Sequence, residues 1–178
     1  ELLQFNQQET EQLRLTYPTT EIVLYGIDEK PKKKWKIRYP IEAEADRTEV
    51  QALLFRLEDL KALAIVDPGP EREKLAPLLT KPKVKVTVHA AGTDQVVRLF
   101  QPDPASGEAY AQTAQDGPIY KVSPSVIKEL TKDLFALQDK RLLGVETGDI
   151  ALLSIKTRDE QYTLVHDRDG WMLEDQPT

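Results

Sequence analysis

Apolar and polar residues alternate in the first part of the chain with the period of two that is typical of half-buried strands. The alternation runs through residues 13–17 and 35–39, and residues 21–27 between them are rich in β-branched and aromatic side chains. Pro40 follows the third segment directly and has no amide hydrogen to donate to a sheet. The pattern therefore predicts a three-stranded antiparallel meander.

An amphipathic helix is predicted directly after this meander. Asp46 is a good N-cap and is followed three residues later by Glu49, the arrangement of a capping box. Apolar residues then recur on one face at helical spacing, namely Val50, Leu53, Leu54, Leu57 and Leu60. Proline and glycine at 68–70 end the segment, and a short helical turn is expected around residues 72–79. We interpret residues 1–80 as one meander-plus-helix unit.

Two hairpins and a second helix are predicted in residues 81–145. Valines alternate with polar residues in 84–88, and a glycine-containing turn leads into a second strand at 95–100. Two shorter strands are expected around 109–113 and 119–122 because turn residues separate these apolar stretches.

The second helix is predicted to begin at Ser123-Pro124, with serine as the N-cap and proline at the first helical position. Its apolar stripe consists of Val126, Ile127, Leu130, Leu134 and Leu137. The run Asp139-Lys140-Arg141 follows the stripe, and its cations are expected to complement the negative end of the helix dipole. An interaction motif is the alternative interpretation of this run.

The end of the chain, where three further strands are predicted, resembles its beginning. The corresponding positions are residues 2–6 and 142–146, Leu13 and Leu153, Leu15 and Ile155, Trp35 and Trp171, Ile37 and Leu173, and Pro40 and Pro177. A chance similarity between two meanders is the alternative. The pattern predicts an α+β fold of antiparallel β-meanders, each followed by an amphipathic helix, in a tandem repeat.

The second copy of this repeat, in residues 146–178, is predicted to be incomplete, because the capped helix of the first copy has no counterpart in it. We therefore expect the natural protein to continue past Thr178. The first residue is glutamate rather than methionine, and we expect a leader or anchor to precede Glu1.

Composition narrows the chemistry that is expected. The formal net charge of −6 argues against nucleic acid as the main partner, since phosphate binding needs a basic excess. The chain has no cysteine, which excludes disulfides, thiolate metal sites and cysteine nucleophiles. No nucleophile elbow, phosphate loop or dinucleotide fingerprint is found, and no apolar run reaches the roughly 18 residues of a membrane span. We expect no catalytic residue, cofactor or small-molecule substrate.

A dense basic run around Trp35 is the predicted interaction surface. Its cations are Lys30, Lys32, Lys33, Lys34, Lys36 and Arg38. Such a run is suited to anionic lipid headgroups or an acidic partner. The alternative is a solvated loop and strand edge, whose lysines deter pairing with another sheet.

The two histidines are not expected to bind a metal ion. His89 and His166 lie in predicted strands, and neither has an i+4 partner. Residues 166–170 faintly resemble a cation loop, but calcium needs more oxygen ligands than they offer. A hairpin turn at Asp169-Gly170 is the simpler interpretation.

Several ordered motifs resemble a bacterial family of domains of unknown function, the one numbered 4340. They are the Tyr-x-Val strand in residues 119–123, the Asp-Lys-Arg-Leu-Leu ending of residues 139–143, and the positions Trp35, Ile37, Pro40, Ala45 and Asp46. The similarity covers nearly the whole chain. Gln138 departs from the arginine of the family pattern, so no fixed role is expected for that position.

The resemblance implies a cellular context rather than a reaction. Such domains are similar to the extracytoplasmic part of membrane-anchored proteins associated with ABC-type transporters of the gliding-motility kind. We therefore expect a non-catalytic binding or scaffolding domain at the periplasmic face, whose partner is a protein such as a transporter component. The alternative is a cell-envelope enzyme or glycan-binding domain, in which case Tyr110, Tyr120 and Trp171 are the aromatic residues expected to line a groove.

Overall fold

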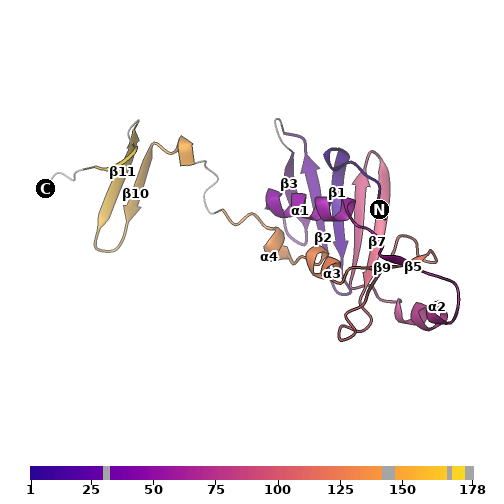
Figure 1. Ribbon diagram of the computed structural model, residues 1–178. Helices are drawn as coiled ribbons and strands as arrows, with labels where there is room; N and C mark the ends of the chain where they lie inside the picture. Colours follow the sequence, from indigo (N-terminus) through magenta and orange to yellow (C-terminus); the bar gives the residue numbers. More distant parts are fainter. Residues whose placement is uncertain (30–32, 142–146, 168–169, 175–178) are drawn as a thin grey trace. The chain divides into compact units, whose positions relative to one another are not determined.

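The computed structural model describes residues 1–29, 33–141, 147–167 and 170–174 (Figure 1). The chain divides into two compact units, unit 1 at Glu1–Lys140 and unit 2 at Arg141–Thr178, which we describe separately. The predicted α+β class is confirmed, because short helices accompany strands that pair mostly antiparallel. Among the described residues, no helix has both the length and the apolar character needed to cross a membrane.

Unit 1 is built on one sheet, with nine strands in the residues that the structure describes, in the order β4-β3-β2-β1-β6-β7-β8-β9-β5. The strands are β1 Thr10–Thr16, β2 Glu21–Ile27, β3 Lys34–Tyr39, β4 Ala43–Glu44, β5 Ala64–Val66, β6 Val84–Ala90, β7 Thr93–Phe100, β8 Ala109–Gln112 and β9 Ile119–Val122. The predicted opening meander is confirmed as β1, β2 and β3. Because β6 pairs with β1, the segments predicted as 1–80 and 81–145 share one sheet.

The predicted hairpin of β6 and β7 is confirmed, but β7 begins at Thr93 rather than at residue 95, so the turn has only two central residues. Ala91 has a φ of 49° and Gly92 a φ of 73°, both in the left-handed region. Two-residue hairpins favour this backbone because its twist matches that of the flanking strands. Glycine adopts it without strain, which explains the glycine at this turn.

Helix α1, Arg47–Glu58, confirms the predicted N-cap. The Asp46 carboxylate accepts hydrogen bonds from the amides of Thr48 and Glu49, at 2.9 and 3.2 Å. The apolar residues Val50, Leu53, Leu54 and Leu57 are buried against the sheet. In a complete capping box the Glu49 carboxylate would accept a hydrogen bond from the Asp46 amide. Here that amide donates instead to the carbonyl oxygen of Leu137, at 2.8 Å. The Glu49 carboxylate is therefore available for another partner.

The prediction of one continuous second helix is wrong. The segment forms two short helices, α3 at Ser125–Leu130 and α4 at Leu134–Leu137. Thr131 has an extended ψ of 91°, and the Asp133 carboxylate caps α4 by accepting from the amide of Ala136 at 2.7 Å. A β-branched residue and a capping aspartate both favour a helix end over a helix interior.

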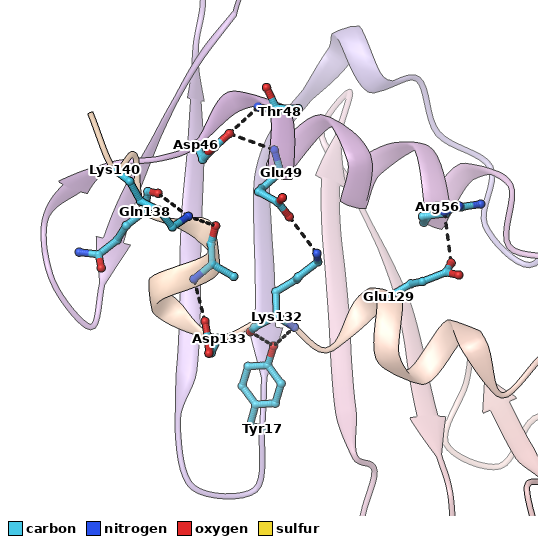
Figure 2. A network of polar contacts seen from close by, with 11 residues as sticks. Tyr17, Asp46, Thr48, Glu49, Arg56, Glu129, Lys132, Asp133, Gln138 and Lys140 are labelled. Carbon is cyan, nitrogen blue, oxygen red and sulfur yellow. Dashed lines mark hydrogen bonds and ion pairs between the residues drawn. The ribbon is translucent and has the colours of Figure 1, made fainter. Parts of the chain in front are cut away.

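A network of polar contacts joins these helices to the sheet (Figure 2). The Tyr17 hydroxyl, at the end of β1, donates to the Lys132 carbonyl at 2.5 Å and accepts from the Lys132 amide at 3.1 Å. The Lys132 ammonium donates to the Glu49 carboxylate of α1 at 2.8 Å. Arg56 and Glu129 form a second bridge between α1 and α3, at 3.2 Å. The break between α3 and α4 therefore places Lys132 between the sheet and α1.

The hydroxyl of Tyr17 provides a pH-dependent test of this network. Burial raises the pKa of Tyr17 to about 12, outweighing the Lys132 amide, which lowers it. The neutral phenol therefore stabilises the fold fully below about pH 10, its ordinary pKa, and this contribution is lost as the pH rises through 12. We expect Tyr17→Phe to lower the free energy of unfolding by about 1 kcal/mol at pH 8 and by less at pH 11. Urea unfolding of both proteins at several pH values measures this difference in free energy, which should become smaller as the pH rises.

Buried apolar side chains form two clusters on opposite faces of the sheet. The larger one lies between the sheet and the helices α1, α3 and α4, and contains Leu99 among others. The smaller one is covered by α2, Pro70–Leu75, and the 3-10 helix η2, Ala76–Leu78; its members are Val66, Leu75, Leu79, Phe100, Tyr110 and Ile119. Leu99 and the adjacent Phe100 belong to different clusters, as the alternation of a strand requires.

Unit 2 contains a three-stranded antiparallel sheet in the described part of its chain. A 3-10 helix, η3 at Thr147–Asp149, precedes the strands β10 Leu152–Lys156, β11 Gln161–Asp167 and β12 Gly170–Leu173. β11 and β12 pair antiparallel, with Asp167 opposite Gly170, the first residue of β12. Asp169 of the predicted turn lies outside the described residues. The predicted repeat matches at residues 142–146 and at Pro177 lie outside the described residues.

Candidate functional site

The predicted basic surface lies on β3 and the residue before it. Lys34, Lys36 and Arg38 alternate with buried residues and are exposed, because β3 is half-buried. Trp35 points the other way and is only 3% exposed, within the larger apolar cluster. The exposed part of the run therefore consists of cations without the indole. Lys32, like Lys30, lies outside the described residues.

Lys33 is held by the backbone of a neighbouring segment. Its ammonium group donates to the carbonyl oxygens of Gln8 and Thr10, at 2.8 Å each, and lies 3.3 Å from the Asp28 carboxylate. Only 17% of this side chain is exposed. Lys33 lies just before β3, and Asp28 lies just after β2. This lysine therefore links both of these strand ends to the segment at the start of β1.

The other described cations of the run also have partners within unit 1. The pairs are Lys34 with Glu29 at 3.1 Å, Lys36 with Glu44 at 3.1 Å, and Arg38 over the ring of Tyr25 at 5.2 Å. Exposed ion pairs of this kind contribute little stability. They do reduce the local positive charge. β3 is not the outermost strand of the sheet, because the short β4 pairs with it at Lys36 and Ile37. Contact of this run with lipid or an acidic partner stays a prediction.

Among the polar hollows that the described residues of unit 1 form, the two larger ones described here were not predicted from the sequence. One, of about 620 Å³, is lined by Asn6, Gln7, Gln8, Asp28, Lys33, Trp35, Arg47, Gln51, Leu54 and Glu58. The Nε of Arg47 is buried there without a hydrogen-bond partner in the described part of the chain. Its walls carry both cations and carboxylates, so the hollow suits a small polar group without a strong preference for charge.

The other hollow, of about 600 Å³, contains two arginines. Arg72 donates to the Gly117 carbonyl at 3.3 Å, and the buried Nη1 of Arg98 has no hydrogen-bond partner within the described residues. Guanidinium groups bind carboxylates and phosphates well. Asp116 lines the same hollow and offsets one of the two charges. The lining residues are far apart in sequence, so no local pattern could have identified them.

The histidines take part in local contacts. His89 Nδ1 lies 2.6 Å from the Asp94 carboxylate, and its Nε2 lies 3.7 Å from Glu11. His166 stacks on Trp171, with ring centroids 4.7 Å apart. The structure shows no group of three or more metal-ligating side chains among the residues that it describes.

Tyr110 and Tyr120 do not line a common groove. Tyr110 is buried in the smaller cluster, where burial and the hydrogen bond that it donates to Glu108 raise its pKa. Tyr120 packs against the larger cluster on the opposite face of the sheet. Adjacent strands place them on opposite faces because Ala111, not Tyr110, is the partner of Tyr120. Trp171 belongs to unit 2.

The sheet of unit 2 has one face made almost entirely of apolar residues. Because direct partners and alternate residues share a face, this apolar face of unit 2 consists of Leu153, Ile155, Tyr162, Leu164, His166, Trp171 and Leu173. Ile155, Trp171 and Leu173 are 45%, 40% and 58% exposed. The opposite face is mixed, because the polar residues Ser154 and Thr163 lie beside a row of Leu152, Val165 and Met172. Leu152 and Met172 are 56% and 53% exposed. Exposed apolar faces of this kind mark interaction sites.

These features define a mixed α+β protein of mostly antiparallel strands, whose second unit has an exposed apolar sheet face. The chain belongs to the family described as a domain of unknown function (DUF4340), whose profile matches residues 35–178. This confirms the family resemblance found in the sequence. No curated protein and no solved structure gives a significant match to the chain.

Proposed function

We propose that this chain is a non-catalytic binding and scaffolding module at the extracytoplasmic face of the cell envelope, carried by a membrane-anchored protein. Its partner is a component of an ABC-type transport system. The exposed apolar face of unit 2 is the observation that supports a binding role most directly. The cellular context rests on the family resemblance.

We also propose that unit 2 and the opening meander of unit 1 are copies of one repeat. Three observations support this. In both meanders the strands pair in the same order, each is preceded by a 3-10 helix, and the first hairpin is closed by equivalent amide-to-carbonyl bonds of 2.8 Å, Tyr17 to Thr20 and Thr157 to Glu160.

The cross-strand register of the two meanders supports the same proposal. Position by position, the facing residues are Leu13-Leu24-Ile37 and Leu153-Leu164-Leu173, then Leu15-Ile22 and Ile155-Tyr162, and finally Gly26-Trp35 and His166-Trp171. A shift of one residue in any strand would move its side chains to the other face. Agreement across all three strands is therefore a stringent criterion.

Affinity capture tests the binding role. The chain is immobilised and exposed to detergent-solubilised membranes of the bacterium that encodes it, and bound transporter subunits are quantified by mass spectrometry. We expect the ATPase or permease to be enriched at least tenfold over a bait carrying Trp171→Glu and Leu173→Glu. A third bait with Lys34→Glu and Lys36→Glu should retain the partner.

Three results would contradict this proposal or part of it. Recovery without any transporter subunit would overturn the transporter role. Equal recovery of the subunit on all baits would show that the apolar face of unit 2 is not the binding surface. Loss of the partner on the lysine bait alone would transfer the binding function to the basic run on β3. Circular dichroism of each bait is the control for folding.

A further inference from the structure

We propose that the hollow of about 600 Å³ on unit 1 binds a small organic carboxylate. Arg72 and Arg98 hold the carboxylate group, and the apolar part of the ligand lies against the apolar lining. This inference goes beyond the proposed function and does not depend on it, because every residue involved belongs to unit 1. It assigns a small-molecule ligand to a chain for which none is expected from the sequence.

Arg98 supplies the observation that points to a ligand. Its Nη1 atom is buried without a hydrogen-bond partner in the described part of the chain, and no described carboxylate forms an ion pair with it. A charged donor that is buried without an acceptor is costly, because it has lost its hydration and gained nothing in return. An acceptor that enters the hollow and bonds to this guanidinium group after a small side-chain rotation would reduce the cost.

The strand register places Arg98 on the side of the sheet that α2 covers. Arg98 and Phe100 are two residues apart in β7 and therefore share a face, and Phe100 belongs to the smaller apolar cluster. The partner of Arg98 in β8 is Gln112, which also lines the hollow. Its partner in β6 is Lys85, which lines a different hollow. Arg98 thus lies at the boundary between the covered and the open part of this face.

Arg72 adds a second guanidinium group, from the helix that covers the sheet. It lies in α2 and is half-buried, and its Nη2 donates to the Gly117 carbonyl at 3.3 Å. This bond uses only one of the several donors of a guanidinium group, so Arg72 keeps donors for a ligand. Gln112 donates to the same carbonyl at 3.4 Å, which holds the connection between β8 and β9 at the edge of the hollow.

The charges that line the hollow favour an anion with a single charge. The two positive charges of Arg72 and Arg98 exceed the one negative charge of Asp116 by one. Asp116 is exposed and forms no ion pair with either arginine in the described part of the chain. A carboxylate matches this balance better than a phosphate group, whose charge is about −1.5 to −2 at neutral pH.

The rest of the lining suits an apolar body of modest size. Its apolar members are Ala76, Leu79, Pro82, Phe100 and Ile119. Small-molecule sites typically have volumes of about 300–1,000 Å³ and combine apolar walls with a few polar groups that fix the orientation of the ligand. The hollow, of about 600 Å³, meets both criteria. An inorganic anion would bond to the arginines but leave the apolar lining unused.

Titration of the full chain with sodium benzoate tests the proposal, because benzoate joins a carboxylate to a flat apolar ring. Hexanoate, which has a flexible apolar body, is the second probe. Binding is measured by isothermal titration calorimetry and located by the amide signal of Gly117 in nitrogen-15 NMR spectra. Benzamide has the shape of benzoate without the charge, and inorganic phosphate has the charge without the apolar body. We expect both to bind at least tenfold more weakly than benzoate.

Three variants locate the site. Arg98→Met keeps a long apolar side chain and removes the guanidinium group, so we expect it to weaken benzoate binding at least tenfold. Without ligand it should leave the urea midpoint unchanged or raise it, because it removes an unpaired buried charge. Arg72→Gln should weaken benzoate binding at least threefold. Arg47→Met is the matched control and should leave the affinity unchanged, since the Nε of Arg47 is likewise buried without a partner in the described residues but lines the other hollow.

Several results would overturn the proposal. Absence of binding by both benzoate and hexanoate to the full chain would do so, also where residues of the chain itself occupy the hollow. Equal affinity for benzamide would show that the charge is not recognised, and equal affinity for phosphate would reduce the site to a general anion site. An equal loss in Arg47→Met would remove the assignment to this hollow. A lower urea midpoint of Arg98→Met would show that its guanidinium group has a partner in the fold.

Discussion

Replacing Trp35 by alanine is expected to lower the free energy of unfolding of unit 1 by about 3–5 kcal/mol. The indole is 3% exposed and packs in the larger apolar cluster with residues of α1. Its removal loses the transfer free energy of a large aromatic side chain and leaves a cavity that the surrounding sheet can fill only in part. Urea unfolding followed by far-UV circular dichroism measures the change without depending on tryptophan fluorescence.

Trp171→Ala is the matched control for this prediction. Trp171 occupies the equivalent strand position, opposite His166 as Trp35 is opposite Gly26, but 40% of it is exposed. We expect its replacement to change the stability of unit 1 by less than about 0.5 kcal/mol. Because Trp171 belongs to unit 2, this control shows whether the effect of removing an indole is specific to unit 1. A loss of less than about 1 kcal/mol at Trp35 would contradict its assignment to the core.

The sequence predicted the elements whose signals are local. Alternation identified β1 and β3, and the side chain of Asp46 located the start of α1 to the residue. These predictions succeed because a strand face, a cap and a helix stripe depend on neighbours within a few positions. Some of the family motif residues lie in such elements, among them Trp35 and Ile37 in β3 and Val122 in β9. The family assignment is confirmed over residues 35–178.

The break in the second helix was missed because an apolar stripe at helical spacing continues across it. Leu130, Leu134 and Leu137 keep the stripe, although Thr131 is extended and Asp133 caps a new helix. Tertiary contacts favour the break, since Lys132 bonds both to Tyr17 and to Glu49. Contacts this far apart in sequence leave no periodic signal.

The basic run illustrates a similar limit of sequence reasoning. Its density of lysines was visible, but the burial of Trp35 and the backbone bonds of Lys33 depend on the assembled sheet. The hollow of about 600 Å³ that Arg72 and Arg98 line had no signal in the sequence, because these residues come together only through the packing of α2 on the sheet. The contacts of surface and site residues therefore became visible only in the structure, whereas the strands could be predicted from the sequence.

The second large effect is expected for Leu57→Ala in α1, which should destabilise unit 1 by about 2–5 kcal/mol. Leu57 is fully buried, and its side chain belongs to the stripe that covers β1–β3. The loss combines reduced apolar burial with a cavity between helix and sheet. Alanine keeps a high helix propensity, so the helix itself is not weakened by the change.

Phe55→Ala provides the control within the same helix. Phe55 is larger than Leu57, yet 56% of it is exposed on the outer side of α1. Its replacement by alanine is expected to cost less than about 1 kcal/mol, because a surface side chain has little area to lose. If removal of the phenylalanine cost more than removal of the leucine, α1 would not cover the sheet through its aliphatic stripe.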